Sequence, residues 1–135
     1  MSLNFAPIAL FCYNRPRHLA ETLDALRENV HACSTQLFVF SDGPRNKYDF
    51  DDINAVREIV HNVKGFKSVS VREHQTNLGL ANSIISGVTE IVEQYGLVIV
   101  LEDDIVLAIA WKKLVYGISK NLIIFHDSIF PKYRG

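Results

Sequence analysis

The chain has 135 residues, of which 48% are hydrophobic and 21% are charged, and 14 Lys and Arg against 15 Asp and Glu give it a formal net charge of -1. A chain of this length can form one domain with a substantial core, and the near-neutral charge argues against a nucleic-acid-binding protein, because such domains carry a basic excess. No apolar run reaches the roughly 18 residues that cross a bilayer, so we expect no transmembrane segment.

The two cysteines and the N-terminal segment indicate the cellular compartment in which the protein is expected. Cys12 and Cys33 are not spaced like metal ligands, and Cys12 lies in an apolar run where a small thiol is commonplace, so we expect both to be structural. The apolar run at residues 6–13 is too short for a signal peptide, and the basic residues Arg15 and Arg17 follow it instead of preceding it. These features predict a cytoplasmic protein.

Short apolar runs alternate with amphipathic helical patterns along the first hundred residues. The runs predict strands at residues 8–13, 37–40, 68–72 and 97–101. Apolar residues at helical spacing predict helices that include residues 19–30, 53–63 and 80–95. This alternation is typical of an α/β fold, here a mainly parallel four-stranded sheet flanked by helices.

Polar residues follow each of the four predicted strands. Because parallel strands share a direction, the residues that follow them lie along one edge of the sheet, where ligands bind in α/β folds. The residues brought to that edge are Asn14 and Arg15, Asp42 and Gly43, Asn77 and Gly79, and Glu102, Asp103 and Asp104. We therefore predict one site built from four loops. The alternative is that Asn14, Asp42 and Asn77 only cap the helices that follow them.

The fourth predicted strand ends in three consecutive carboxylates, Glu102, Asp103 and Asp104. Adjacent acidic side chains repel one another unless a cation or several hydrogen-bond donors compensate them. Carboxylate oxygens suit Mg²⁺ and Mn²⁺ equally, so the sequence predicts a divalent metal without distinguishing between the two.

Missing motifs exclude several other nucleotide-binding classes. None of the seven glycines precedes the Lys-Ser/Thr pair of a P-loop. Residues 13–17, after the first strand, lack the Gly-x-Gly-x-x-Gly of a dinucleotide-binding unit. The glycine-rich pyrophosphate loop of sugar nucleotidyltransferases is also missing, and a response-regulator receiver would carry its acidic pair after the first strand.

Four segments in this order resemble the donor-binding half of GT-A glycosyltransferases, in particular family 2 enzymes and relatives of N-acetylglucosaminyltransferase I. The segments are residues 7–16, 40–43, 77–79 and 102–104, and the likeness extends over about residues 6–106. The resemblance implies a Rossmann-like nucleotide-binding domain at residues 1–106. It also implies an enzyme that takes a nucleotide sugar, with a UDP-sugar as the expected donor, and transfers the sugar to an acceptor hydroxyl.

The resemblance assigns the acidic residues to the ribose, the metal and the base. Glu102 and Asp103 would face the ribose, and Asp104, together with Asp103, would hold the Mn²⁺ or Mg²⁺ ion that bridges the diphosphate. Asp42 would hydrogen-bond the edge of the base, where a carboxylate suits the imide N–H of uracil.

The remaining site residues of the resemblance come from the first and third loops. Arg15 would lie near the diphosphate, where its guanidinium group offers charge-assisted hydrogen bonds, and Asn14 would belong to the same donor site. The turn at Asn77 and Gly79 would let the backbone approach the donor.

Residues 107–135 do not resemble the continuation of the family. Apolar residues at helical spacing, Leu114, Ile118, Leu122 and Phe125, predict a helix packed on the domain or at an interface. The acceptor-binding half and general base of a GT-A enzyme have no counterpart there, so two hypotheses stay open. The chain is a glycosyltransferase domain, or it is a truncated, non-catalytic nucleotide-binding remnant or a module completed by another chain. We also expect a homo-oligomer, because a missing acceptor half would expose apolar surface.

Overall fold

The computed structural model describes residues 5–103 and 122–124 of the chain. Its main elements alternate between strand and helix in the predicted order. They are β1 (Ile8–Cys12), α1 (Pro16–Arg27), β2 (Gln36–Ser41), α2 (Phe50–His61), β3 (Ser68–Glu73), α3 (Leu80–Tyr95), β4 (Val98–Glu102) and β5 (Leu122–Ile124), with short 3-10 turns η1 (Ala32–Ser34) and η2 (Lys47–Asp49). The predicted α/β class is confirmed, and β1 to β4 begin and end within one residue of the predicted limits.

The strands form one parallel sheet in the order β3-β2-β1-β4-β5. Ile8 of β1 is paired with Leu37 on one side and with Ile99 on the other, so β1 is a central strand. The chain moves outward from β1 through β2 to β3 and then returns to place β4 on the opposite side of β1. Ligands bind in open α/β sheets at such a reversal, outside the carboxyl ends of the strands.

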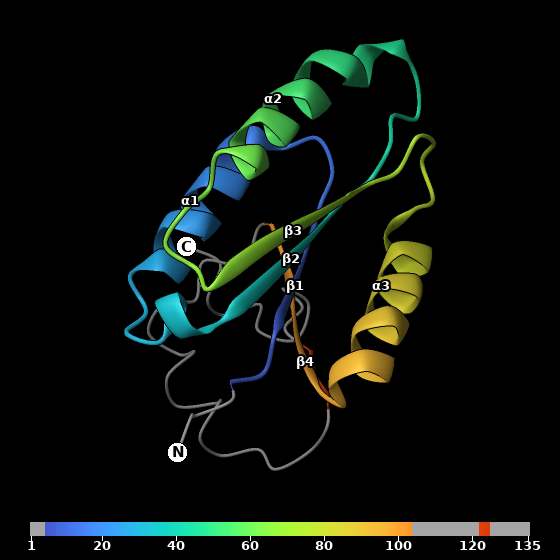
Figure 1. The fold of residues 1–135 in the computed structure, drawn as a ribbon. Coiled ribbons are helices and arrows are strands. Elements are labelled where there is room, and N and C mark those ends of the chain that lie inside the picture. The colour runs from blue at the N-terminus through green and yellow to red at the C-terminus, as the bar shows by residue number, and fades with distance from the viewer. Residues whose placement is uncertain (1–4, 104–121, 125–135) are drawn as a thin grey trace, which may run out of the picture.

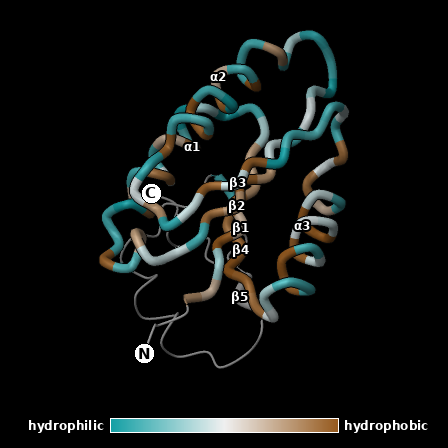
Figure 2. Tube along the Cα trace, in the orientation of Figure 1, coloured by the Kyte–Doolittle hydropathy of each residue, from teal (hydrophilic) through white to brown (hydrophobic). Residues whose placement is uncertain are grey.

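Helices cover both faces of this sheet. Helices α1 and α2 lie over one face, and α3 lies over the other (Figure 1). All five residues of β1 are buried and alternate between the two faces: Leu10 packs with Leu23 of α1, whereas Phe11 packs with Ile91 of α3. Hydrophobic residues accordingly run along β1 and β4 (Figure 2). A strand covered on both faces is apolar throughout, which explains why the sequence shows short continuous apolar runs.

The tail contains a strand where the spacing predicts a helix. Leu122–Ile124 pair in parallel with β4, with Val98 opposite Leu122 and Val100 opposite Ile124. The helical interpretation is therefore wrong for these three residues, because the backbone groups along the edge of β4 offer a partner that spacing in the sequence does not reveal. Residues 104–121 and 125–135, and with them Asp104, lie outside the described part of the chain.

None of the helices in the described ranges combines the length and the hydrophobicity that crossing a membrane demands.

Candidate functional site

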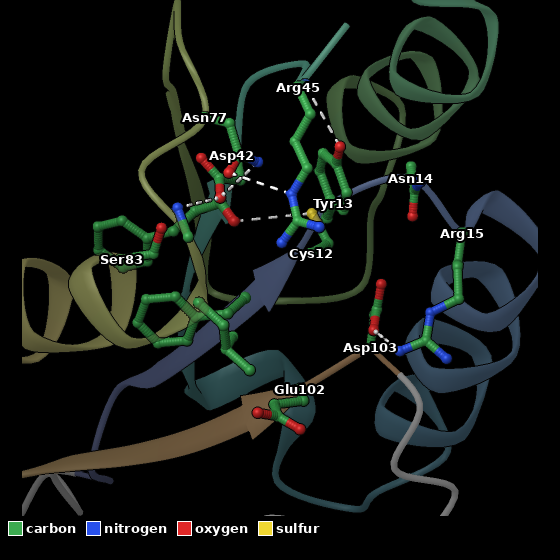
Figure 3. Close-up of a pocket in the computed structure, with 14 residues that line it drawn as sticks. Cys12, Tyr13, Asn14, Arg15, Asp42, Arg45, Asn77, Ser83, Glu102 and Asp103 are labelled. Carbon is green, nitrogen blue, oxygen red and sulfur yellow. Dashed lines mark hydrogen bonds and ion pairs between the residues drawn. The ribbon is translucent and has the colours of Figure 1, made fainter. Parts of the chain in front are cut away.

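A pocket of about 270 Å³ lies at the carboxyl ends of the strands, where the sheet order reverses between β1 and β4. Its lining comes from the loops that follow β1, β2 and β3, from the first turn of α3 and from the end of β4 (Figure 3). The lining includes every described residue that we predicted to contact a nucleotide sugar: Asn14, Arg15, Asp42, Asn77, Gly79, Glu102 and Asp103. The topology therefore brings the four polar loops together.

The alternative, in which Asn14, Asp42 and Asn77 serve as helix caps, is wrong. The residues at the N-caps of α1, α2 and α3 are Arg15, Asp49 and Gly79, and none of the three caps its helix through a side-chain hydrogen bond. Helix α1 begins instead with Pro16, whose fixed φ and missing N–H suit the first helical position. The side chains of Asn14, Asp42 and Asn77 instead form hydrogen bonds that connect one loop to another.

Asp42 holds the turn that follows β3. Its Oδ1 accepts hydrogen bonds from the backbone N–H groups of Gly43 and Leu78, both at 2.9 Å, and its Oδ2 accepts from the N–H of Gly79 at 3.1 Å and from Nδ2 of Asn77 at 3.2 Å. Gly79 has φ +83°, a conformation that a residue without Cβ adopts readily. Both oxygens of this buried carboxylate are occupied, so the imide N–H that we expected Asp42 to bind would have to compete with these donors.

Asn77 and Arg45 form the wall of the pocket beside that turn. The Asn77 amide donates to the carbonyl of Gly43 at 3.0 Å and accepts from Nε of Arg45 at 3.5 Å. The Arg45 guanidinium carbon lies 5.7 Å from the centre of the Tyr13 ring, within the range of a cation–π contact. Arg45 and Tyr13 were not predicted as site residues, because an exposed arginine in a loop and an aromatic residue after a strand are common in any sequence.

Asp49, just before α2, ties the first loop of the site to the second. Its carboxylate accepts hydrogen bonds from the hydroxyl of Tyr13, from Nδ2 of Asn14 at 3.1 Å and from the N–H of Arg45 at 2.9 Å. Burial, together with the hydrogen bond to Asp49, raises the pKa of Tyr13. The same hydrogen bond from Tyr13 is the main reason that the pKa of Asp49 is lowered. The hydrogen bond to Asp49 therefore fixes the side chain of Asn14 where it lines the pocket.

Arg57 of α2 secures the strand ends from behind the pocket. Its guanidinium group donates to the carbonyls of Ser41, Asp42 and His74 at 3.5, 3.4 and 2.8 Å, and to Oγ of Ser41 at 3.1 Å. Charge-assisted hydrogen bonds of this kind are about twice as strong as neutral ones. The ends of β2 and β3 are thus joined by one side chain. The sequence does not reveal this role, because an arginine on an amphipathic helix usually faces solvent.

The acidic end of β4 lies across the pocket from Asp42 and Asn77 (Figure 3). Glu102 and Asp103 are only 6% and 5% exposed. Nη2 of Arg15 lies 3.4 Å from Oδ1 of Asp103, and the hydroxyl of Thr22 donates to the Asp103 carbonyl at 2.7 Å. The carboxylate of Asp103 points toward Arg15, whereas that of Glu102 lies apart from this pair (Figure 3). The structure therefore separates the two carboxylates that are adjacent in the sequence.

A divalent metal ion is predicted at the acidic end of β4. Residues 5–103 and 122–124 contain no group of three His, Cys, Asp or Glu side chains that could hold a metal ion. An ion that bridges substrate phosphates needs only one or two protein carboxylates, however. Asp103, with Asp104 next to it in the sequence, has the right donor chemistry for an ion held jointly with phosphates, although Asp103 also interacts with Arg15.

Cys12 also lines the pocket, but its thiol is not poised for nucleophilic chemistry. It is buried beneath the loops and lies 3.7 Å from the carbonyl of Phe40. Burial, with a further contribution from the negative charge of Asp103, raises the pKa of the Cys12 thiol. A thiol that stays protonated is a poor nucleophile and a poor metal ligand, which agrees with a structural role for this cysteine.

No family model, no curated protein and no solved structure matches this chain. The proposal for the function is therefore based on the residues that line the pocket.

Proposed function

We propose that this chain binds the nucleoside diphosphate part of a nucleotide sugar, with a UDP-sugar as the donor, in the pocket between the ends of β1 and β4. The observation that carries the proposal is the uneven lining of the pocket. Phe11, Phe40 and Leu80 contribute apolar surface, and Arg15 and Arg45 contribute two guanidinium groups. A nucleoside diphosphate has the same asymmetry, with a flat, largely apolar base at one end and anionic phosphates at the other.

The position of Arg15 supports its assignment to the phosphates. Ser83, on the α3 side, and Arg15, on the α1 side, lie on opposite sides of the pocket, with Arg45 between them (Figure 3). A guanidinium group pairs with phosphate oxygens through two parallel charge-assisted hydrogen bonds. The Arg15 side chain is 47% exposed, so it can reach an incoming ligand.

The proposed reaction is sugar transfer from the bound donor. The hydroxyl of an acceptor attacks the anomeric carbon and gives up its proton to a base or to water, and the nucleoside diphosphate leaves with the electrons of the bond that breaks. A bound Mn²⁺ or Mg²⁺, held by Asp103 and Asp104, would supply the charge that stabilises the leaving diphosphate. Arg15 supports the same function from the protein side, because it places a permanent positive charge beside the pocket.

Calorimetric titration with UDP, with and without Mn²⁺, tests the binding step. We expect heat of binding in both conditions and a tighter complex with Mn²⁺. The Arg15→Ala variant should bind UDP about ten- to a hundredfold more weakly, because hydrogen bonds to charged groups contribute about 1.5–3 kcal/mol. Hydrolysis of a UDP-sugar, measured in parallel, distinguishes a catalytic domain from one that only binds.

Arg17→Ala provides the matched control. Arg17 is an exposed arginine on α1 that pairs with Glu21 and does not line the pocket, so its loss should leave UDP affinity unchanged. If UDP gives neither heat nor a thermal shift with the wild-type protein, the nucleotide-binding proposal is wrong.

A further inference from the structure

Ser83 is a buried polar residue in the wall of the pocket. It belongs to the first turn of α3, is 2% exposed, and its hydroxyl has no hydrogen-bond partner among the residues that the structure describes. A serine inside a helix commonly bonds the carbonyl four residues earlier. Here the carbonyl of Gly79 accepts the backbone N–H of Ser83, at 3.0 Å, and not the hydroxyl. A buried polar group without a partner costs free energy, which calls for an explanation.

Close packing of α3 on the sheet keeps Ser83 in this position. One turn further along α3, a Cβ added to Gly87 would come within 2.9 Å of the Phe11 ring and 3.0 Å of the Phe40 ring. The two rings are stacked, with their centres 4.9 Å apart. Because Gly87 leaves no gap there, α3 packs tightly on the sheet, and this packing holds the backbone of Ser83 beside the pocket. Ser83, Phe11 and Phe40 line the same pocket.

The hydroxyl of Ser83 differs from the carboxylate of Asp42 in its capacity to bind a ligand. The oxygens of Asp42 already accept four hydrogen bonds of 2.9–3.2 Å from protein donors, and Nδ1 of His74 lies 3.5 Å from Oδ1. The hydroxyl of Ser83 can donate one hydrogen bond and accept others, and no described residue uses that capacity. A polar group of this kind beside aromatic side chains suits a flat heterocycle with a polar edge.

We infer that Ser83 recognises the base of the bound nucleotide, its Oγ hydrogen-bonding the carbonyl and imide edge of uracil, while Asp42 positions the turn that closes the pocket. The inference rests on the proposed nucleotide-binding function and adds the residue that contacts the base. It places the base against α3 and the phosphates toward Arg15, because these two residues lie on opposite sides of the pocket (Figure 3). Ser83 thus contributes to affinity for the nucleoside and not to affinity for the phosphates.

Titrations of wild type and Ser83→Ala with UDP and with inorganic pyrophosphate test this assignment. We expect Ser83→Ala to bind UDP roughly three- to tenfold more weakly, which corresponds to one hydrogen bond, and to bind pyrophosphate as wild type does. The thermal midpoint of Ser83→Ala should stay the same or rise, because the change removes a buried, unbonded hydroxyl and introduces a strong helix former. Ser86→Ala, an exposed serine on the same helix outside this pocket, should change neither affinity.

Two results would overturn the assignment. Unchanged UDP affinity in Ser83→Ala would show that the hydroxyl does not contact the base, and an equal loss for UDP and pyrophosphate would show that Ser83 acts only through the shape of the pocket. Failure of the wild-type protein to bind UDP is a separate result, which would remove the proposed function itself.

Discussion

Asp49 shows how a single side chain joins segments that are distant in the sequence. Its carboxylate accepts hydrogen bonds from Tyr13 and Asn14, which follow β1, and from the backbone of Arg45, which follows β2. Asp49 therefore fixes the relation between the first and second loops of the pocket. Because the Tyr13 hydrogen bond lowers the pKa of Asp49, the strength of this connection depends on pH.

Removal of the Tyr13 hydroxyl should change the pH dependence of stability. A carboxylate whose pKa is lowered by folding stabilises the folded state above its ordinary pKa of 3.8, and this stabilisation is lost as the pH falls through the lowered pKa. The pKa of Tyr13 is raised, so its contribution to stability depends on pH in the alkaline range. This contribution is present below the ordinary tyrosine pKa of 10.0 and is lost as the pH rises through the raised pKa. We therefore expect Tyr13→Phe to be less stable than wild type near pH 6, with a difference that shrinks as the pH falls through the lowered pKa of Asp49.

Urea unfolding at a series of pH values measures this difference in the free energy of unfolding. Tyr48→Phe is the matched control, because Tyr48 is 81% exposed and should give no pH-dependent difference. A Tyr13→Phe difference that is the same at every pH would contradict the proposed role of the Tyr13 and Asp49 pair.

At the level of elements, Arg57 connects one helix to two strands. It extends from α2 to the carbonyls at the ends of β2 and β3, and its side chain is 19% exposed. Asp42 comes directly after β2, and the turn that it holds comes after β3. The position of the second and third loops of the pocket therefore depends on a residue that does not line the pocket.

Loss of Arg57 should destabilise the domain and loosen the pocket. We expect Arg57→Ala to lower the free energy of unfolding by about 2–3 kcal/mol, because it leaves half-buried carbonyls without their charged donor. Arg57→Lys should be intermediate, since an ammonium group keeps the charge but cannot bond several carbonyls in one plane. Urea unfolding is the measurement.

Arg72→Ala is the control for this prediction. Arg72 is an arginine on β3 whose ion pair with Glu90 is close to half exposed on both sides, so its loss should cost less than about 1 kcal/mol. Equal effects of the Arg57 and Arg72 changes would show that the bonds of Arg57 to the strand ends do not stabilise the fold.

For the whole molecule, stability should decrease from the centre of the sheet toward β3. All residues of β1 and β4 are buried, whereas β3 pairs only with β2 in the described sheet and its Ser68, Arg72 and Glu73 are exposed. Local opening requires less free energy where few buried contacts are lost.

Hydrogen exchange of backbone amides tests this gradient. We expect the amides of β1 to exchange most slowly, with protection close to the global free energy of unfolding, and those of β3 to exchange through local opening. UDP should slow exchange in the turn at residues 77–79, because the turn lines the proposed site. Protection in β3 equal to that in β1 would contradict the predicted gradient.

The sequence by itself determined the order of the elements, the limits of the first four strands and the meeting of four polar loops at one edge of the sheet. These features follow from local periodicity and from the shared direction of parallel strands, which bring Asn14, Asp42, Asn77 and Glu102 together without any knowledge of side-chain contacts.

Only the tertiary structure decided how those residues are used. It showed that Asn14 bonds Asp49 instead of capping α1, that the carboxylate of Asp42 is occupied by the turn after β3, and that Leu122–Ile124 form a strand. It also brought the buried Ser83 into the lining of the pocket. The physical reason is that hydrogen-bond partners and burial depend on residues far apart in the chain, whereas sequence patterns report the tendencies of neighbours.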